Sequence, residues 1–243
     1  MLLPDAELIS ELRVAFRTVG PTISQHYVLI GLVLPLDMVD LKSHEPALKK
    51  ILDHFGRLDV LISNAGRYIK GDWHEIDLAV DKELFEVNVF SVVNMNRLVV
   101  KHFLQVGGGQ IAVVSSIAGK VGVVLSGPYA ASKHALQGYF NSLRMETYGK
   151  NIHVTLICPG PVQTPIFHAA FTHQPGETTA GKPLQGEISE NRMTSERCAF
   201  LSLVAIANRL TETWLSKLPI IPMIYAALYL PVVSEFFSRL GGP

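Results

Sequence analysis

The sequence predicts an α/β fold built on a doubly wound parallel sheet, with helices on both faces. Short apolar runs alternate along the chain with longer stretches in which apolar residues recur every three or four positions. The short runs are continuously apolar, which is typical of parallel strands buried on both faces. The length of 243 residues suits one such domain, or two small ones.

The composition limits the classes of function. With 21 basic and 21 acidic residues, the chain has no basic field for nucleic acid. A hydrophobic content of 48% supplies a large core and leans toward a membrane-associated protein. The two cysteines, Cys158 and Cys198, make neither a disulfide framework nor a zinc ligand set, so we expect a reducing compartment and no metal. The first residues lack the basic and long apolar regions of a secretory signal.

The first part of the chain contains the first two predicted strands. Residues 5–19 have the apolar spacing of an amphipathic helix, which Gly20 and Pro21 would end. Residues 27–36 form a continuous apolar run, expected to be a buried strand. Helical spacing over 42–55 and a second apolar run over 58–63 follow. The alternation of strand and helix therefore begins in this region.

The central part of the chain continues the alternation. Residues 78–105 predict one long helix that is apolar on most faces, and therefore buried against the sheet or a partner subunit. Three glycines, 107–109, follow it and precede the apolar strand 110–115. Because they lie between a helix and a strand, we interpret them as a helix stop and not as a phosphate-binding loop.

The last part adds two strands, a long loop and an apolar tail. Residues 152–158 and 213–216 are predicted strands, and Thr194 or Ser195 is the expected cap of a helix that ends at residue 208. Residues 167–192 are polar and loop-like, which is typical of a lid or a disordered segment.

The tail, 217–243, is the most apolar region of the chain. Prolines interrupt it, and its longest unbroken run falls short of the roughly 20 residues needed to cross a bilayer. We favour an element on the membrane surface. A cap over the substrate pocket and a dimer contact are the alternatives.

A tyrosine and a lysine carry the clearest chemical signal. If a helix begins near Pro128, Tyr129 and Lys133 share one of its faces. A phenol has a reference pKa of about 10, so it exchanges protons near neutrality only when a cation stabilises the phenolate. Lys133 is placed to do so, and Ser116, at a strand end, is placed to hydrogen-bond a substrate oxygen. The tyrosine–lysine spacing alone also occurs by chance on many helices.

This constellation resembles the short-chain dehydrogenase/reductase family, which transfers hydride between a nicotinamide cofactor and a carbonyl or alcohol. Asn64-Ala65-Gly66 after one strand and the sequence PGPVQT after another also match family motifs. The resemblance implies that Ser116, Tyr129, Lys133 and Asn88 are catalytic, with Asn88 supporting a proton relay. It implies that the cofactor contacts Asp37, Asn64, Ala65, Gly66, Tyr129, Lys133, Pro159, Gly160, Val162 and Thr164.

The resemblance covers only part of the family pattern. The sequence lacks the opening strand, the glycine-rich turn of the type TGxxxGIG and the second strand, which in the family meet the cofactor pyrophosphate. We therefore expect an incomplete, N-terminally truncated Rossmann-like domain over 27–216, preceded by a separate segment, 1–26. Without the two missing strands, we expect strand 27–36 to pair directly with strand 58–63.

Within the family, several segments and the apolar tail look most like the dehydrogenase/reductase member 7 group. That resemblance implies an enzyme at the endoplasmic reticulum membrane that reduces lipophilic carbonyls, such as steroids or retinoids, with NADP(H) rather than NAD(H). It also implies a homodimer formed through the long helices. The alternatives are a cytoplasmic protein and a catalytically silent truncated isoform that acts through protein association.

Overall fold

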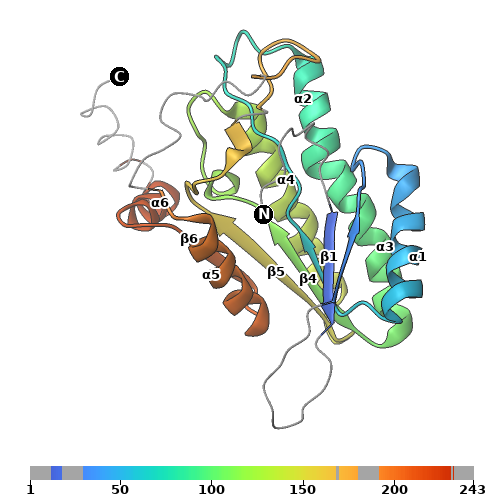
Figure 1. Ribbon diagram of the computed structural model, residues 1–243. Coiled ribbons are helices and arrows are strands. Elements are labelled where there is room, and N and C mark those ends of the chain that lie inside the picture. Colours follow the sequence, from blue (N-terminus) through green and yellow to red (C-terminus); the bar gives the residue numbers. More distant parts are fainter. Residues whose placement is uncertain (1–11, 18–29, 168–169, 180–191, 231, 233–243) are drawn as a thin grey trace.

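A four-stranded parallel sheet is the centre of the molecule (Figure 1). The computed structural model describes residues 12–17, 30–167, 170–179, 192–230 and 232. The strands lie in the order β3-β4-β5-β6, and every neighbouring pair is parallel. They are β3 (Val60–Ser63), β4 (Gly109–Val114), β5 (Ile152–Pro159) and β6 (Glu212–Leu215). The predicted α/β fold with a parallel sheet is confirmed.

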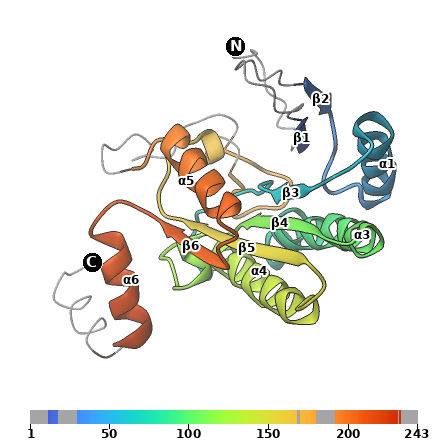
Figure 2. The ribbon, with the colours of Figure 1, turned by 90° about the horizontal axis from the view of Figure 1, so that it is seen from below.

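Helices cover both faces of this sheet. Figure 2 shows α3 and α4 on one face and α5 on the other. The larger core lies between the first face of the sheet and its helices. It contains Phe103, Ile111, Leu136 and Leu156, which are all at most 1% exposed. A smaller core packs α5 against Ala112 and Ile157. The helices are α1 (His44–Phe55), α3 (Ser91–Val106), α4 (Gly127–Glu146) and α5 (Ser195–Ala207).

The predicted long helix over 78–105 is interrupted by a change of helix type. It consists of α2 (Leu78–Phe85), the π-helical turn η2 (Glu86–Phe90) and α3. Such π turns are rare and frequently lie at functional sites. The periodicity of the sequence did not predict this turn, which contains Asn88.

Several predicted helix ends are confirmed. The Oγ1 atom of Thr194 accepts a hydrogen bond from Arg197 N–H and caps α5. Gly107 ends α3 in the left-handed conformation, with φ of 89°, as expected of a helix stop. Three short 3-10 helices complete this part of the fold: η1 (Leu41–Ser43), η3 (Ile117–Gly119) and η4 (Pro165–Phe167).

Two predictions for the N-terminal region are wrong. Part of the predicted helix 5–19 is strand β1 (Leu12–Arg17), and its remaining residues lie outside the described part of the chain. β1 pairs antiparallel with β2 (Ile30–Leu34) in a separate two-stranded sheet, so β2 does not pair with β3. The reason is physical: β1 supplies the backbone partners that a strand needs, and β2 no longer requires the edge of the main sheet.

The outer edge of β3 is open within the described ranges. No described strand pairs there, because β3 is the terminal strand of its sheet. Leu61 and Ser63 are buried, whereas Val60 and Ile62 are 37% and 40% exposed. Their side chains alternate with the buried pair and therefore lie on the opposite face of the sheet.

The predicted apolar tail contains α6 (Ile220–Tyr229). Most of the residues after it lie outside the described part of the chain. Among the described helices, none has the length and apolar character needed to cross a membrane.

Candidate active site

The predicted site residues gather where strands β3, β4 and β5 end. Gly66 follows β3, Ser116 follows β4, and Pro159 is the last residue of β5. The three strands are parallel and adjacent, so their carboxyl ends share one edge of the sheet. Ligands of open α/β sheets bind at this edge.

Helix α4 brings Tyr129 and Lys133 to this edge. It begins at Gly127 with Pro128 in its first turn, where the missing proline N–H costs no hydrogen bond. The Nζ atom of Lys133 lies 5.7 Å from the centroid of the Tyr129 ring. It donates a 3.0 Å hydrogen bond to Val114 O at the end of β4. The predicted helix and the shared face of this pair are confirmed.

The ionisation of these two residues differs from the expectation. Burial raises the pKa of Tyr129 to about 12, although a hydrogen bond with Ser116 lowers it and the Tyr68 phenol raises it further. Burial lowers the pKa of Lys133 to about 8. Lys133 is not among the groups that shift the pKa of Tyr129 here, and its role in lowering that pKa stays a prediction. The ammonium group faces the ring and Val114 O, and desolvation dominates at both groups.

Ser116 joins two strand ends at the site. It is the N-cap of η3, and its Oγ atom accepts from Ala118 N–H at 3.1 Å. The same hydroxyl donates to Pro159 O at 3.3 Å. These bonds hold Ser116 between the ends of β4 and β5, within reach of Tyr129.

Asn88 connects the π turn to α4 and to the segment after β3. Its Oδ1 accepts from Arg67 N–H at 2.7 Å, and its Nδ2 donates to Arg67 O at 2.9 Å. Nδ2 also donates to Ser132 Oγ, whose hydroxyl donates to Tyr129 O. Asn88 is fully buried. Its side chain is therefore a fixed support of α4, which carries Tyr129 and Lys133.

Gly66 leaves space that any side chain would occupy. A Cβ atom there would lie 3.3 Å from Asn88 Oδ1 and 3.4 Å from Lys133 Nζ. The Gly66 backbone is thus packed closely against Asn88 and the predicted catalytic lysine, at the sheet edge where ligands of open α/β sheets bind. Asn64 and Ala65 precede Gly66 at the end of β3 and belong to the same segment.

The segment after β5 is also positioned by backbone contacts. Gly160 N–H donates to Leu215 O at 2.8 Å, and Val162 forms an isolated parallel bridge with Met193. Thr164 is exposed, one residue before η4. Pro159 and Gly160 therefore lie at the site edge, whereas the structure shows no contact that fixes the Thr164 hydroxyl.

Asp37 is not joined to the other site residues by hydrogen bonds. Its carboxylate accepts from Val39 N–H at 3.0 Å, in the turn between β2 and η1. Because β2 belongs to the separate sheet, this turn does not continue a strand of the main sheet. The predicted adenine contact of Asp37 stays a prediction. No cluster of metal-ligating side chains occurs among the described residues.

A polar network behind the site was not predicted. Lys120 pairs with Glu212 at 2.6 Å and donates to Gln137 Oε1 at 2.9 Å. Gln137 donates to Ser115 Oγ and to Cys158, and Ser115 donates to Lys133 O. The network joins the end of β4, β5, β6 and α4 directly behind Lys133. No single residue type or spacing indicates such long-range contacts.

Gly119 is essential for the contact between η3 and α4. A Cβ there would lie 2.7 Å from both Lys133 O and Ser115 Oγ. We expect Gly119→Ala to lower the free energy of unfolding by about 1–3 kcal/mol, since backbone must move to admit the methyl group. The measurement is urea denaturation. Gly122→Ala is the matched control, because a Cβ there meets nothing within 4 Å. Equal midpoints for both variants would contradict the expectation.

The structure adds Tyr68 to the site. Its ring lies edge-on to that of Tyr129, with centroids 4.9 Å apart and an interplanar angle of 63°. Its hydroxyl is 2.5 Å from Ser126 Oγ. The position of Tyr68, two residues after Gly66, was the only signal in the sequence that could have indicated it.

Comparison with known proteins decides the family. A sequence model of the short chain dehydrogenase family matches residues 25–175, more than half of the chain. The chain belongs to the short-chain dehydrogenase/reductase family. It is 41% identical over 213 residues to dehydrogenase/reductase SDR family member 7 from Homo sapiens, covering 87% of this chain and 61% of that protein. The predicted likeness to this group is confirmed.

Solved structures agree with this family. A short-chain dehydrogenase from Streptomyces avermitilis is 22% identical, with a TM-score of 0.67, over 85% of this chain and 77% of that one. At this identity the likeness supports the fold alone. The structure of ElxO with NADP bound is 25% identical, with a TM-score of 0.60, over 75% of each chain. This short-chain dehydrogenase spans about three fifths of the human relative that it matches.

Proposed function

We propose that this short-chain dehydrogenase transfers hydride between a nicotinamide cofactor and a lipophilic carbonyl or alcohol, steroid-like or retinoid-like. The observation that carries the proposal is the joint placement of Ser116, Tyr129 and Lys133 at the carboxyl edge of the sheet. Asn88 holds the same helix through Ser132. Membership of the family supports the reaction class.

The protonation state of Tyr129 at neutral pH is compatible with carbonyl reduction. When bound, the cofactor supplies the hydride. Because the pKa of Tyr129 is about 12, its phenol holds a proton at neutral pH and is able to donate it to a carbonyl oxygen. Lys133, with a pKa of about 8, exchanges protons near the working pH. Ser116 orients the carbonyl, and Asn88 supports the return of a proton to Lys133.

The close approach of the Gly66 backbone to Lys133, at the carboxyl edge of the sheet, supports a nicotinamide in this half of the site. Asn64, Ala65, Pro159 and Gly160 are the other residues that would line this half of the site. We propose NADP(H) in preference to NAD(H), which the NADP-bound state of ElxO supports. Asp37, Val162 and Thr164 are proposed contacts of the remaining cofactor groups.

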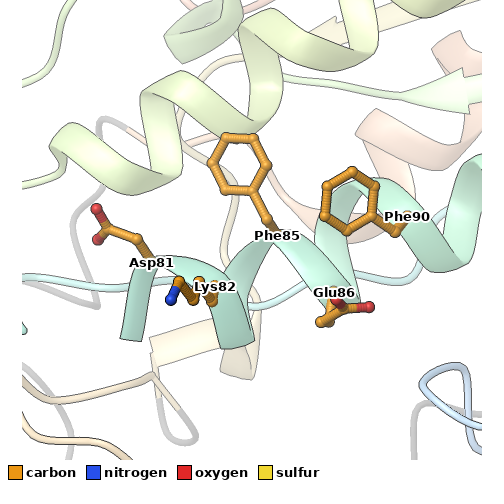
Figure 3. Close-up of a pocket in the computed structure, with 5 residues that line it drawn as sticks. All are labelled: Asp81, Lys82, Phe85, Glu86 and Phe90. Atoms are coloured by element: carbon orange, nitrogen blue, oxygen red, sulfur yellow. The ribbon is translucent and has the colours of Figure 1, made fainter. Parts of the chain in front are cut away.

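We propose a homodimer through the outer faces of α3 and α4. Leu104, Val106 and Met145 are 49%, 58% and 76% exposed. At the other end of α3, α2 and η2 form a cavity of about 290 Å³, lined by Asp81, Lys82, Phe85, Glu86 and Phe90. Figure 3 shows the rings of Phe85 and Phe90 side by side at this cavity. An exposed apolar hollow of this kind suits a side chain of a second copy.

We propose that the apolar tail meets a lipid surface. On α6, Met223, Tyr225 and Tyr229 are 63%, 50% and 71% exposed. Tyr225 stacks on Tyr229 and packs against Trp214, which makes an aromatic group suited to a membrane interface. Localisation at the endoplasmic reticulum membrane stays a prediction from the resemblance, with the cytoplasm as its alternative.

A second candidate function is a catalytically silent protein that acts through protein association. The open edge of β3, with exposed Val60 and Ile62, favours it. The glycine-rich turn that would hold the pyrophosphate is not found in this sequence. The second function predicts that no nicotinamide cofactor stabilises the chain.

Thermal unfolding with and without cofactor separates the two functions. At 100 times the dissociation constant, NADPH should stabilise the folded state by about 2.7 kcal/mol and raise Tm by about 5–10 °C. NADH at the same concentration should raise Tm less. The measurement is calorimetry of the purified chain.

Gly66→Ala supplies the control for this measurement. The added methyl group approaches Lys133 Nζ and Asn88 Oδ1, so it should reduce the shift caused by NADPH. Gly122→Ala lies in open space and should keep the full shift. No shift with either cofactor would refute the oxidoreductase and support the silent protein.

A further inference from the structure

Tyr68 lies beside Tyr129 but has no role in the proposed reaction as described so far. It lies in the segment after β3, and its hydroxyl is 2.5 Å from Ser126 Oγ. Its ring meets the Tyr129 ring edge-on at 4.9 Å. Such edge-to-face pairs are favourable beyond the area that they bury. Tyr68 therefore contacts both the helix start and the proton donor that the helix carries.

At Ser126, the contact with the Tyr68 hydroxyl takes the place of the usual hydrogen bond that caps a helix. It is the N-cap residue of α4, the helix that carries Tyr129 and Lys133. A serine at this position normally accepts a hydrogen bond from the first turn, worth about 1 kcal/mol to the helix. Here the side chain makes no cap bond, is fully buried, and meets the Tyr68 hydroxyl instead. The start of the helix is thus fastened to Tyr68.

The backbone of Tyr68 is fixed as well. Tyr68 O accepts a 2.8 Å hydrogen bond from Phe171 N–H, and Ile69 forms a parallel bridge with Phe171. The guanidinium of Arg67 lies 4.5 Å from the centre of the Phe171 ring. The described part of the long loop, 170–179, therefore holds the segment that carries Tyr68.

We propose that Tyr68 is a positioning residue for Tyr129, which it holds in place through its ring contact and its hydrogen bond to Ser126. The inference rests on the proposed function for its effect on turnover. The structural part of the inference can be tested without turnover. It states that the position of the Tyr129 ring depends on the Tyr68 hydroxyl.

Tyr68→Phe tests this directly, because it keeps the ring and removes only the hydroxyl that meets Ser126. Ser126→Ala removes the other partner of the same bond. Tyr139→Phe is the matched control, since Tyr139 is 42% exposed on α4. In protein labelled with ¹³C-tyrosine, the Tyr129 resonance is identified by its loss in Tyr129→Phe. Its chemical shift reports the position of the ring.

We expect Tyr68→Phe and Ser126→Ala to move the Tyr129 resonance, and Tyr139→Phe to leave it in place. In both test variants kcat should fall by about tenfold, on the order of one hydrogen bond, with KM close to that of the parent and Tm lower by about 2–4 °C, because the bond that fastens the start of α4 is lost. An unchanged Tyr129 resonance in both would overturn the inference. A parent without turnover would refute the proposed function only, because the resonance still decides the position of Tyr129.

Discussion

Replacing Tyr129 with phenylalanine is expected to lower kcat by about 10²–10⁴-fold, the usual contribution of a positioned general acid. The change removes the hydroxyl that holds the proton at neutral pH and keeps the ring that contacts Tyr68. Cofactor affinity should stay nearly intact, because Lys133 and Gly66 are unchanged. The measurements are steady-state reduction of a lipophilic ketone and a fluorescence titration with NADPH.

Tyr139→Phe removes the same atom from an exposed position on the same helix and should leave kcat unchanged. Equal turnover by parent and Tyr129→Phe would defeat the assignment of Tyr129 as proton donor. A loss of turnover with an equal loss of NADPH affinity would instead assign Tyr129 to cofactor binding.

The second large effect concerns stability. Lys133 is 4% exposed, and burial lowers its pKa from 10.5 to about 8. Burying the ammonium therefore costs on the order of 3 kcal/mol at pH 7. Lys133→Met removes this cost, so the variant should unfold at a higher urea concentration than the parent at pH 7 while losing activity.

The sign of the pH dependence follows from the lowered pKa. Between pH 8 and 10.5 the unfolded lysine binds more protons than the folded one. The free energy of unfolding of the parent therefore gains about 3 kcal/mol from this group as pH rises through that window. Cys158, whose pKa burial raises to about 11, acts in the opposite direction in both proteins, and Lys133 is only the last of the causes that shift its pKa. The advantage of Lys133→Met should accordingly disappear near pH 10.5.

Urea denaturation of both proteins at pH 7 and pH 10.5 measures this difference. Lys101→Met, which removes an exposed lysine from α3, should show no such pH-dependent advantage. A stability difference between Lys133→Met and the parent that is the same at both pH values would contradict the expectation.

The elements with strong local signals could be predicted from the sequence. The continuous apolar runs predicted β3, β4 and β5, β6 lies at the predicted last strand, and the spacing of Tyr129 and Lys133 on one helix face is observed in α4. Thr194 begins α5 through the hydrogen bond of its hydroxyl, and Gly107 ends α3 because glycine readily adopts the left-handed conformation. In each case the interaction that decides the local structure lies within a few residues of the residue that indicates it in the sequence.

The predictions that failed depend on distant contacts. β1 was taken for a helix because apolar spacing over 12–17 fits either period, and only its pairing with β2 decides the question. The ionisation of Tyr129 depends on burial, which the spacing to Lys133 does not reveal. The π turn at Asn88 and the bond between Tyr68 and Ser126 join segments 21 and 58 residues apart.

The open edge of β3 has a consequence for the behaviour of the protein in concentrated solution. Gln110 N–H donates to Asp59 O, so the alternating backbone groups of Val60 and Ile62 point away from β4. A strand edge that exposes unpaired backbone N–H and C=O groups beside apolar side chains is able to pair with a strand of another chain. A β-forming segment able to reach this edge would extend the sheet along β3, which is four residues long. This edge is accordingly the place where self-assembly into larger aggregates would begin, and where a soluble partner strand would prevent it.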